Sequence, residues 1–349
     1  MLPKINHREL LSFVDVSYNT KQPLLITGAP GIGKTDAIMS YCADRGVDLI
    51  VSHPVISMPE DFKGLPVKTE RVNTKTGKKD TIAEFLPFDD LAFALETEGD
   101  TVWFFDDLGQ AVNSVQAACM QIFGNRVIGG KNLSDSVRLM AATNRREDMA
   151  GVKGLLEPVK SRFGMIVELV ADVDIWSRWA TAQGIFQPII DHVNYNPVAL
   201  HDFKPNTGME NSPCPRLWEK LSGQLLFADK KNISPEIREK MVIACVGESH
   251  GSQFCAFEKI YRQLPTYDQA ISDEDFDMPN RLDILFAFCG MLASKAKQID
   301  EVRVFDLVDL MPPACQMYIY KTMGNINPGM LDTARARLWA TQNVSLLMD

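Results

Sequence analysis

The amino-acid sequence predicts an α/β fold in which a parallel β-sheet is flanked by helices and followed by a mainly helical region. Three observations support this prediction. Short apolar runs alternate with segments of helical periodicity as far as about residue 170, the first run leads directly into a glycine-rich loop, and the apolar spacing beyond residue 170 is mainly helical. Strands that alternate with helices imply a parallel sheet with right-handed crossovers.

The first part of the chain has the pattern helix, strand, loop, helix. We expect residues 4 to 18 to form an amphipathic helix, residues 23 to 27 a buried strand and residues 35 to 41 a further helix, because the apolar spacing changes accordingly. The loop at residues 28 to 35 has the spacing G-x-x-x-x-G-K-[ST] of a phosphate-binding loop. In such a loop the glycines let successive N–H groups point at phosphate oxygens, and the following helix presents its positive end to the same anion.

The loop therefore predicts a nucleotide site. We expect Lys34 to reach the β- and γ-phosphates and Thr35 to ligate Mg²⁺. The expected binding residues are Gly28, Ala29, Pro30, Gly31, Ile32, Gly33, Lys34 and Thr35.

After an expected strand at residues 48 to 53, residues 57 to 87 interrupt the alternation. Prolines and glycines recur there, so this insert is expected to be a hairpin or loop. Its bases suggest a locally basic surface in an acidic protein, although a solvated surface loop is equally compatible with this composition. The bases are Lys63, Lys68, Arg71, Lys75, Lys78 and Lys79.

Two later apolar runs end in polar residues that suit the same site. Residues 101 to 105 are followed by Asp106 and Asp107, and residues 137 to 142 are followed by Thr143 and Asn144. Buried parallel strands deliver their C-terminal residues to the sheet edge where ligands bind. We therefore expect Asp106 to hold Mg²⁺, Asp107 to orient the attacking water and Asn144 to contact the γ-phosphate or that water.

The remaining elements are expected from periodicity alone. Helices are predicted at residues 88 to 96 and 113 to 123, a short strand entering a turn at 126 to 131, and a last strand at 165 to 169. In the helical region, Trp176, Trp179 and Trp218 are expected to pack in the core. Arg216 opens a helix there and has no apolar role.

Composition limits the class of protein. The 349 residues, 46% apolar and 23% charged, suit two or three globular domains. A net charge of −9 argues against broad binding to nucleic acid or anionic membranes. Seven cysteines without a C-x-x-C pair suggest reduced thiols, and no run approaches the roughly 18 apolar residues of a membrane span. We expect a cytoplasmic protein.

These motifs resemble those of the AAA+ ATPases and, within them, the MoxR-like group. The match spans roughly residues 5 to 225 and rests on GAPGIGKT (Walker A), TVWFFDDLGQA (Walker B), MAATNR (sensor 1), LLEPVKSRFG (the arginine-finger helix) and PCPRLWEKLS (the sensor 2 position). The insert, beginning SMPEDFKGLP, is similar to the helix 2 insert of that clade.

The resemblance implies a P-loop AAA+ domain at residues 1–170 with its insert at 57–87, an α-helical lid at 171–268 and a C-terminal helical extension at 269–349. It implies that ATP and Mg²⁺ are bound, that Asn144 is sensor 1, Arg162 the finger and Arg216 sensor 2. Because a finger acts on the neighbouring subunit's nucleotide, it also implies a homo-oligomeric ring, usually a hexamer. Family members act as chaperone-like remodellers, often alongside a protein with a von Willebrand factor A domain.

One departure from the family leaves alternatives open. The family usually has Asp-Glu where this chain has Asp106-Asp107, and an aspartate is one methylene shorter. A misplacement near 1 Å can reduce a rate by about 100-fold, unless a backbone shift restores the geometry. A slowly hydrolysing, nucleotide-gated scaffold is therefore one alternative. A nucleic-acid motor or loader that uses the insert with Arg126 and Lys131 is the other.

Overall fold

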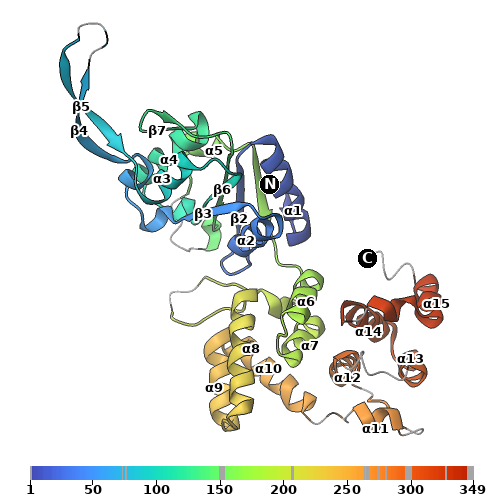
Figure 1. The fold of residues 1–349 in the computed structure, drawn as a ribbon. Helices are drawn as coiled ribbons and strands as arrows, with labels where there is room; N and C mark the ends of the chain where they lie inside the picture. Colours follow the sequence, from blue (N-terminus) through green and yellow to red (C-terminus); the bar gives the residue numbers. More distant parts are fainter. Residues whose placement is uncertain are drawn as a thin grey trace. The chain divides into compact units, whose positions relative to one another are not determined.

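The protein is described here from a computed structural model, which forms two compact units, Met1–Val170 and Ala171–Asp349. Figure 1 shows the helices and strands of both units. The residues described are 2–72, 74, 77–148, 154–205, 208–262, 264, 267–272, 276–279, 281–294, 301–326 and 328–343. Lys75, one of the expected bases of the insert, lies outside them.

The first unit is built on a six-stranded sheet with the order β1-β10-β2-β9-β6-β3, in which every neighbouring pair is parallel. The strand β2, which precedes the phosphate-binding loop, therefore lies between β10 and β9, and β9 separates it from β6. The strands are β1 (Lys4–Ile5), β2 (Leu24–Gly28), β3 (Asp48–Ser52), β6 (Thr101–Phe105), β9 (Val137–Thr143) and β10 (Met165–Leu169). The predicted parallel α/β fold is confirmed.

Helices cover both faces of this sheet, which explains why its strands are almost continuously apolar. Phe104 packs in a core with α1 and α2, whereas its neighbours Trp103 and Phe105 pack in a second core with α3, α4 and α5. This is the alternation of side chains expected along a strand. The helices are α1 (His7–Thr20), α2 (Lys34–Arg45), α3 (Asp89–Glu96), α4 (Asn113–Asn125) and α5 (Glu157–Lys160).

The N-terminal segment differs from the expected helix at residues 4 to 18. Lys4 and Ile5 pair with β10 as the edge strand β1, and the helix begins only at His7. Asn6 is its N-cap, because its side chain accepts a hydrogen bond from the backbone N of Glu9 at 3.0 Å while the Glu9 carboxylate accepts from the backbone N of Asn6 at 2.9 Å. This capping box satisfies two N–H groups at the helix start and so sets where the helix begins.

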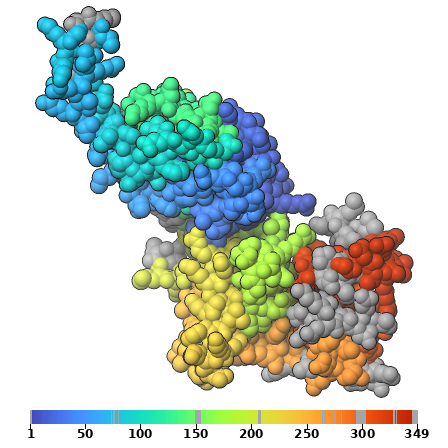
Figure 2. All heavy atoms as spheres, in the orientation of Figure 1, coloured from blue at the N-terminus to red at the C-terminus, as the bar shows by residue number. Residues whose placement is uncertain are grey.

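The insert contains an antiparallel hairpin, the arm, formed by β4 (Leu65–Val72) and β5 (Lys79–Leu86). The arm projects from the body of the first unit in Figure 1 and in the space-filling view of Figure 2. Glu60, Asp61, Glu70, Asp80 and Glu84 accompany the six bases of residues 57 to 87, so the insert is less basic than its lysines and arginine alone suggest. The short strand expected to enter a turn at 126 to 131 is present as β7 (Val127–Ile128), and the turn leads into β8 (Lys131–Asn132) to complete a smaller hairpin.

The second unit is helical among its described residues. Trp176 and Trp218 are buried in one of its two apolar cores, as expected, whereas Trp179 is 40% exposed. The second core gathers residues of the C-terminal helices, and a boundary near residue 268 stays a prediction. The helices are α6 (Val173–Ala182), α7 (Gln187–Tyr195), α8 (Pro215–Lys230), α9 (Pro235–Val246), α10 (Glu248–Tyr261), α11 (Tyr267–Ser272), α12 (Leu282–Ser294), α13 (Glu301–Asp309), α14 (Pro313–Ile326) and α15 (Ala334–Gln342).

The cysteines and the lengths of the helices can be compared with the expectations from sequence. All seven cysteines are buried and free, in keeping with the expected reduced thiols. Among the helices that the structure describes, none has the length and apolar character needed to cross a bilayer.

Candidate functional site

The loop after β2 has the backbone that a phosphate-binding loop requires. Gly31 and Gly33 have φ values of 73° and 89°, in the left-handed region that favours glycine. A Cβ on Gly28 would lie 2.7 Å from the carbonyl oxygen of Leu169, so the close approach of β10 also demands glycine there. The ring Nε2 of His7 lies 2.7 Å from the carbonyl oxygen of Ile32, which ties the loop to the start of α1.

Lys34, the first residue of α2, lies inside this loop and is only 7% exposed. Its Nζ donates to the carbonyl oxygens of Gly28 and Ala29, both at 3.0 Å. It also donates to Oδ1 of Asn144 at 2.7 Å. The lysine thereby connects the loop to the end of β9.

The two expected magnesium ligands lie together. The hydroxyl Oγ1 of Thr35 donates to Oδ2 of Asp106 at 2.6 Å. The backbone N of Asp106 donates to the carbonyl oxygen of Ser52 at 2.9 Å, which extends the pairing of β6 with β3 and fixes the carboxylate at the sheet edge. A hydroxyl and a carboxylate oxygen side by side are ligands of the kind that Mg²⁺ prefers.

Asp107 follows in a left-handed conformation with a φ of 56°. Its backbone N donates to Oδ1 of Asp106 at 3.0 Å, and its own Oδ1 accepts from Nδ2 of Asn144 at 3.3 Å. The amide of Asn144 thus bridges the lysine and the carboxylate, with its oxygen toward Nζ of Lys34 and its nitrogen toward Asp107. Of these two groups, the ammonium can only donate and the carboxylate can only accept, so the amide oxygen faces the first and the amide nitrogen the second.

Lys34, Asn144 and Asp107 therefore form one hydrogen-bonded chain, and Thr35 and Asp106 join it through the backbone of Asp107. The two predicted arginines are not joined to it by any hydrogen bond among the described residues. Arg162 is exposed just after α5. Its side chain lies against Gly124 of α4, because a Cβ on that glycine would be 2.7 Å from Nε of Arg162. Arg216 is exposed in the first turn of α8, in the second unit.

Three groups at the site were not expected from sequence. His7 gave no local signal, because it lies 25 residues before its partner Ile32. Gln110 donates from Nε2 to Oδ1 of Asp107 at 2.6 Å, and a polar residue three positions after an aspartate in a turn is a signal that could have been used.

The third group is Arg145, which directly follows Asn144. Its guanidinium donates to Asp148 at 2.7 Å and to Glu168 of β10 at 3.2 Å. The hydrogen bond to Asp148 is the main reason why the pKa of Arg145 is raised, so this cation stays charged and anchors the segment that carries Asn144.

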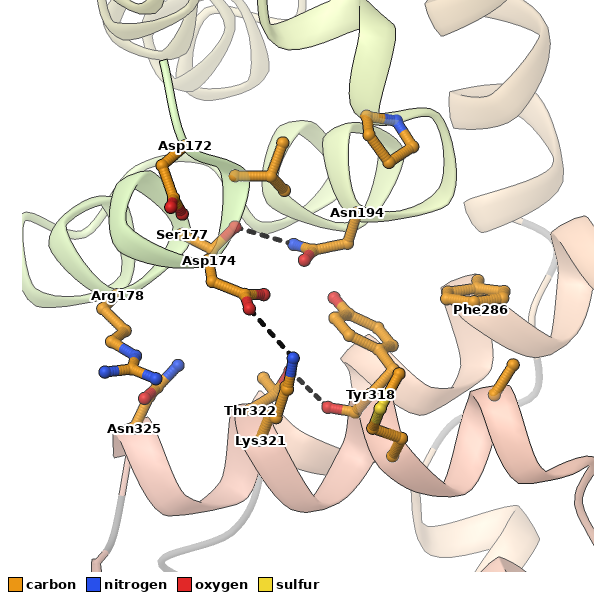
Figure 3. A pocket seen from close by; sticks show the side chains of 14 residues that line it. Asp172, Asp174, Ser177, Arg178, Asn194, Phe286, Tyr318, Lys321, Thr322 and Asn325 are labelled. Atoms are coloured by element: carbon orange, nitrogen blue, oxygen red, sulfur yellow. Dashed lines mark hydrogen bonds and ion pairs between the residues drawn. The ribbon is translucent and has the colours of Figure 1, made fainter. Parts of the chain in front are cut away.

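A separate cavity of about 480 Å³ lies in the second unit between α6, α7, α12 and α14. Figure 3 shows its lining, in which Lys321 pairs with Asp174 at 2.9 Å and Asn194 donates to Ser177 at 2.9 Å. The ring of Tyr318 also lines it. Asp174 and Lys321 are paired with each other, and none of the predicted site residues lies there.

The hydroxyl of Tyr318 donates to the buried Asp191 of α7 at 2.5 Å, and Gln187 donates to the same Oδ1 at 2.8 Å. Burial raises the pKa of Asp191 to about 7, although these two hydrogen bonds lower it. A Cβ on Gly290 of α12 would lie 2.1 Å from both carboxylate oxygens. The absence of a side chain at Gly290 therefore makes room for this carboxyl group.

No family model and no curated protein matches the chain. Solved structures do. A lysine-to-arginine mutant of RuvB from Thermotoga maritima matches with 16% identity and a TM-score of 0.43, over 89% of this chain and 91% of that one. RuvB from the same organism, described as a Holliday junction branch migration motor, matches with 17% identity and a TM-score of 0.41, over 88% and 89%.

A proline-to-glycine mutant of that RuvB matches with 17% identity and a TM-score of 0.43, over 90% of this chain and 94% of that one. The likeness is low in both identity and TM-score, so it carries no conclusion about activity. The strand order and the loop after β2 give the first unit a parallel α/β fold with a phosphate-binding loop.

Proposed function

We propose that this protein is a MoxR-like AAA+ ATPase that hydrolyses ATP in an oligomeric ring to remodel or assemble a partner protein. The observation that carries this proposal is the hydrogen-bonded chain from Lys34 through Asn144 to Asp107, beside the Thr35 and Asp106 pair. A cation, an amide, a carboxylate and a pair of oxygen ligands at one sheet edge are the groups that phosphoryl transfer to water requires.

The residues present fit a nucleotide and Mg²⁺. The left-handed glycines let the loop curl, Lys34 is held within it, and Thr35 and Asp106 offer adjacent oxygen ligands. Lys34 would hold the β- and γ-phosphates, and Thr35 and Asp106 would hold the metal. When bound, Mg²⁺ supplies positive charge that offsets the charge developing on the transferred phosphoryl group.

The chain's own groups divide the remaining work. Asp107 orients the attacking water and accepts a hydrogen bond from it, while Asn144 supports the water or the γ-phosphate from the neighbouring strand. The buried setting of Lys34 strengthens its interaction with phosphate, because screening by solvent is weak there. Catalysis of this kind rests on electrostatic stabilisation and positioning, without a covalent intermediate.

The ring is proposed from Arg162. Its guanidinium is exposed and makes no hydrogen bond to the network among the described residues, which suits a group that completes the site of the next subunit. The resemblance makes a hexamer the expected assembly and Arg216 the sensor 2 residue. A protein with a von Willebrand factor A domain is the expected class of partner.

The arm is proposed as the surface that engages the partner. It projects from the first unit (Figure 2). It also exposes apolar side chains, three at the paired ends of β4 and β5 and one near the turn, which would be buried on binding. The exposed apolar residues are Leu65, Val72, Phe85 and Leu86. The nucleic-acid alternative rests on the bases of the same insert.

Calorimetric ATP binding and steady-state hydrolysis test the proposed activity. Lys34→Ala should lose most of its ATP affinity, because a buried charge facing the phosphates is removed. Asp107→Asn should still bind ATP but should lose steady-state turnover, leaving only a slow residual hydrolysis that single-turnover measurements detect. Lys4→Ala, which removes an exposed lysine of the same unit, serves as the control and should behave as wild type. Undiminished ATP binding by Lys34→Ala would show that the site is wrongly assigned.

A further inference from the structure

Gln110 is the last residue of a 3₁₀ turn, Leu108–Gln110, that directly follows Asp107. Its backbone N donates to the carbonyl oxygen of Asp107 at 3.0 Å, and its side-chain Nε2 donates to Oδ1 of the same residue at 2.6 Å. Leu108 between them is fully buried and Gly109 is also buried, so the turn is fixed by packing. The glutamine is thereby held against the carboxylate at two points.

In the described part of the chain, every side chain that donates a hydrogen bond to the Asp107 carboxylate donates to Oδ1. Gln110 and Asn144 donate to this oxygen from different elements, at 2.6 and 3.3 Å. Two donors on one oxygen fix the rotation of the carboxyl group about its side-chain bonds. Oδ2 is then the oxygen that can accept a hydrogen bond from a water.

The other end of the Gln110 amide is unusual. Its Oε1 is buried, and no hydrogen-bond partner for it is found among the described residues. A buried acceptor without a partner costs free energy, which a methionine of similar length would avoid. The amide is therefore unfavourable for stability at this position, and its donation to Asp107 is the feature that a hydrocarbon could not provide.

We propose that Gln110 is a positioning residue for the hydrolytic water. It holds the short Asp107 side chain so that Oδ2 faces the site, and in this way offsets the methylene that the chain lacks relative to a glutamate. This inference rests on the proposed ATPase function and adds a residue to it. Gln110 acts only through Asp107 and does not touch the nucleotide.

A double-mutant cycle tests this role. Gln110→Met should lower kcat about 10- to 100-fold, in the range that a misplaced catalytic group produces, while the Kd for ATP stays within twofold. In an Asp107→Asn background, Gln110→Met should not lower the single-turnover rate of ATP hydrolysis further, because the carboxylate that Gln110 positions is gone. Gln110→Glu should also lower kcat, since it places a second carboxylate beside the first.

Gln121→Glu is the matched control, because Gln121 is exposed on α4 of the same unit. It adds the same charge away from the site and should leave kcat unchanged. Wild-type kcat in Gln110→Met, or an equal loss with and without the Asp107 carboxylate, would overturn the positioning role while leaving the ATPase proposal intact. A wild-type protein that binds ATP but never hydrolyses it would overturn both. Retained ATP binding by each variant shows that it is folded.

Discussion

Replacing Gly290 by alanine should destabilise the second unit, even though alanine is the better helix former. Gly290 lies within α12, and a Cβ there would come 2.1 Å from Cγ and both oxygens of Asp191. The carboxyl group is fully buried and held by Tyr318 and Gln187, so it cannot swing into solvent. Either α12 or α7 must move.

The magnitude follows from three opposing contributions. Alanine gains about 1 kcal/mol over glycine in a helix interior. The two hydrogen bonds to Asp191 are worth roughly 1 kcal/mol each, and overpacking costs about 1–3 kcal/mol. We expect a net loss of about 2–4 kcal/mol, which lowers Tm by roughly 5–15 °C for a unit of this size.

Differential scanning calorimetry of the full chain measures this loss. Gly223→Ala is the matched control, because Gly223 lies in α8 and nothing is within 4 Å of its Cβ position. That variant should be stabilised by about 1 kcal/mol. If Gly290→Ala proved as stable as Gly223→Ala, the steric argument would be wrong. In an Asp191→Ala background, Gly290→Ala should cause little further loss, since the clashing group is then absent.

Three further predictions concern charge. Asp191 has its pKa raised to about 7, mainly by burial, so its contribution to stability is complete below the unfolded value of about 4 and is lost as the pH rises through 7. Asp191→Asn should reduce the loss of unfolding free energy between pH 4 and pH 8 by about 4 kcal/mol, measured by urea unfolding. Burial lowers the pKa of His192 to about 4, and its effect on the pH dependence is the same in both proteins. Arg162→Ala should bind ATP but hydrolyse it about 10³- to 10⁵-fold more slowly, and mixing it with Lys34→Ala should partly restore turnover; no restoration at any ratio would contradict a role in trans. Replacing three bases of the insert with glutamate should leave basal hydrolysis unchanged. If the wild-type protein bound single- or double-stranded DNA and the variant did not, the nucleic-acid alternative would be favoured. The three bases are Arg71, Lys78 and Lys79.

The groups of the candidate site differ in how far the sequence could predict them. The loop at residues 28 to 35 is contiguous, so its glycines and Lys34 are visible as a pattern. Asp106 and Asn144 could be expected at the same edge because parallel strands all end there. The hydrogen bond from Lys34 to Asn144 was not predictable, since it depends on β9 lying between β2 and β6. Strand order is decided by pairing between segments far apart in the chain.

Local features of the sequence by themselves determined the fold class, the phosphate-binding loop and the position of most strands. Periodicity and spacing act over a few residues, and the chain carries them wherever it folds. Only the tertiary structure decided which partners meet across long separations, as with His7 and Ile32 or Asp191 and Gly290. It also decided that Trp176 is buried whereas Trp179, on the same helix, is 40% exposed. Burial depends on what packs against each face, and no local pattern specifies that.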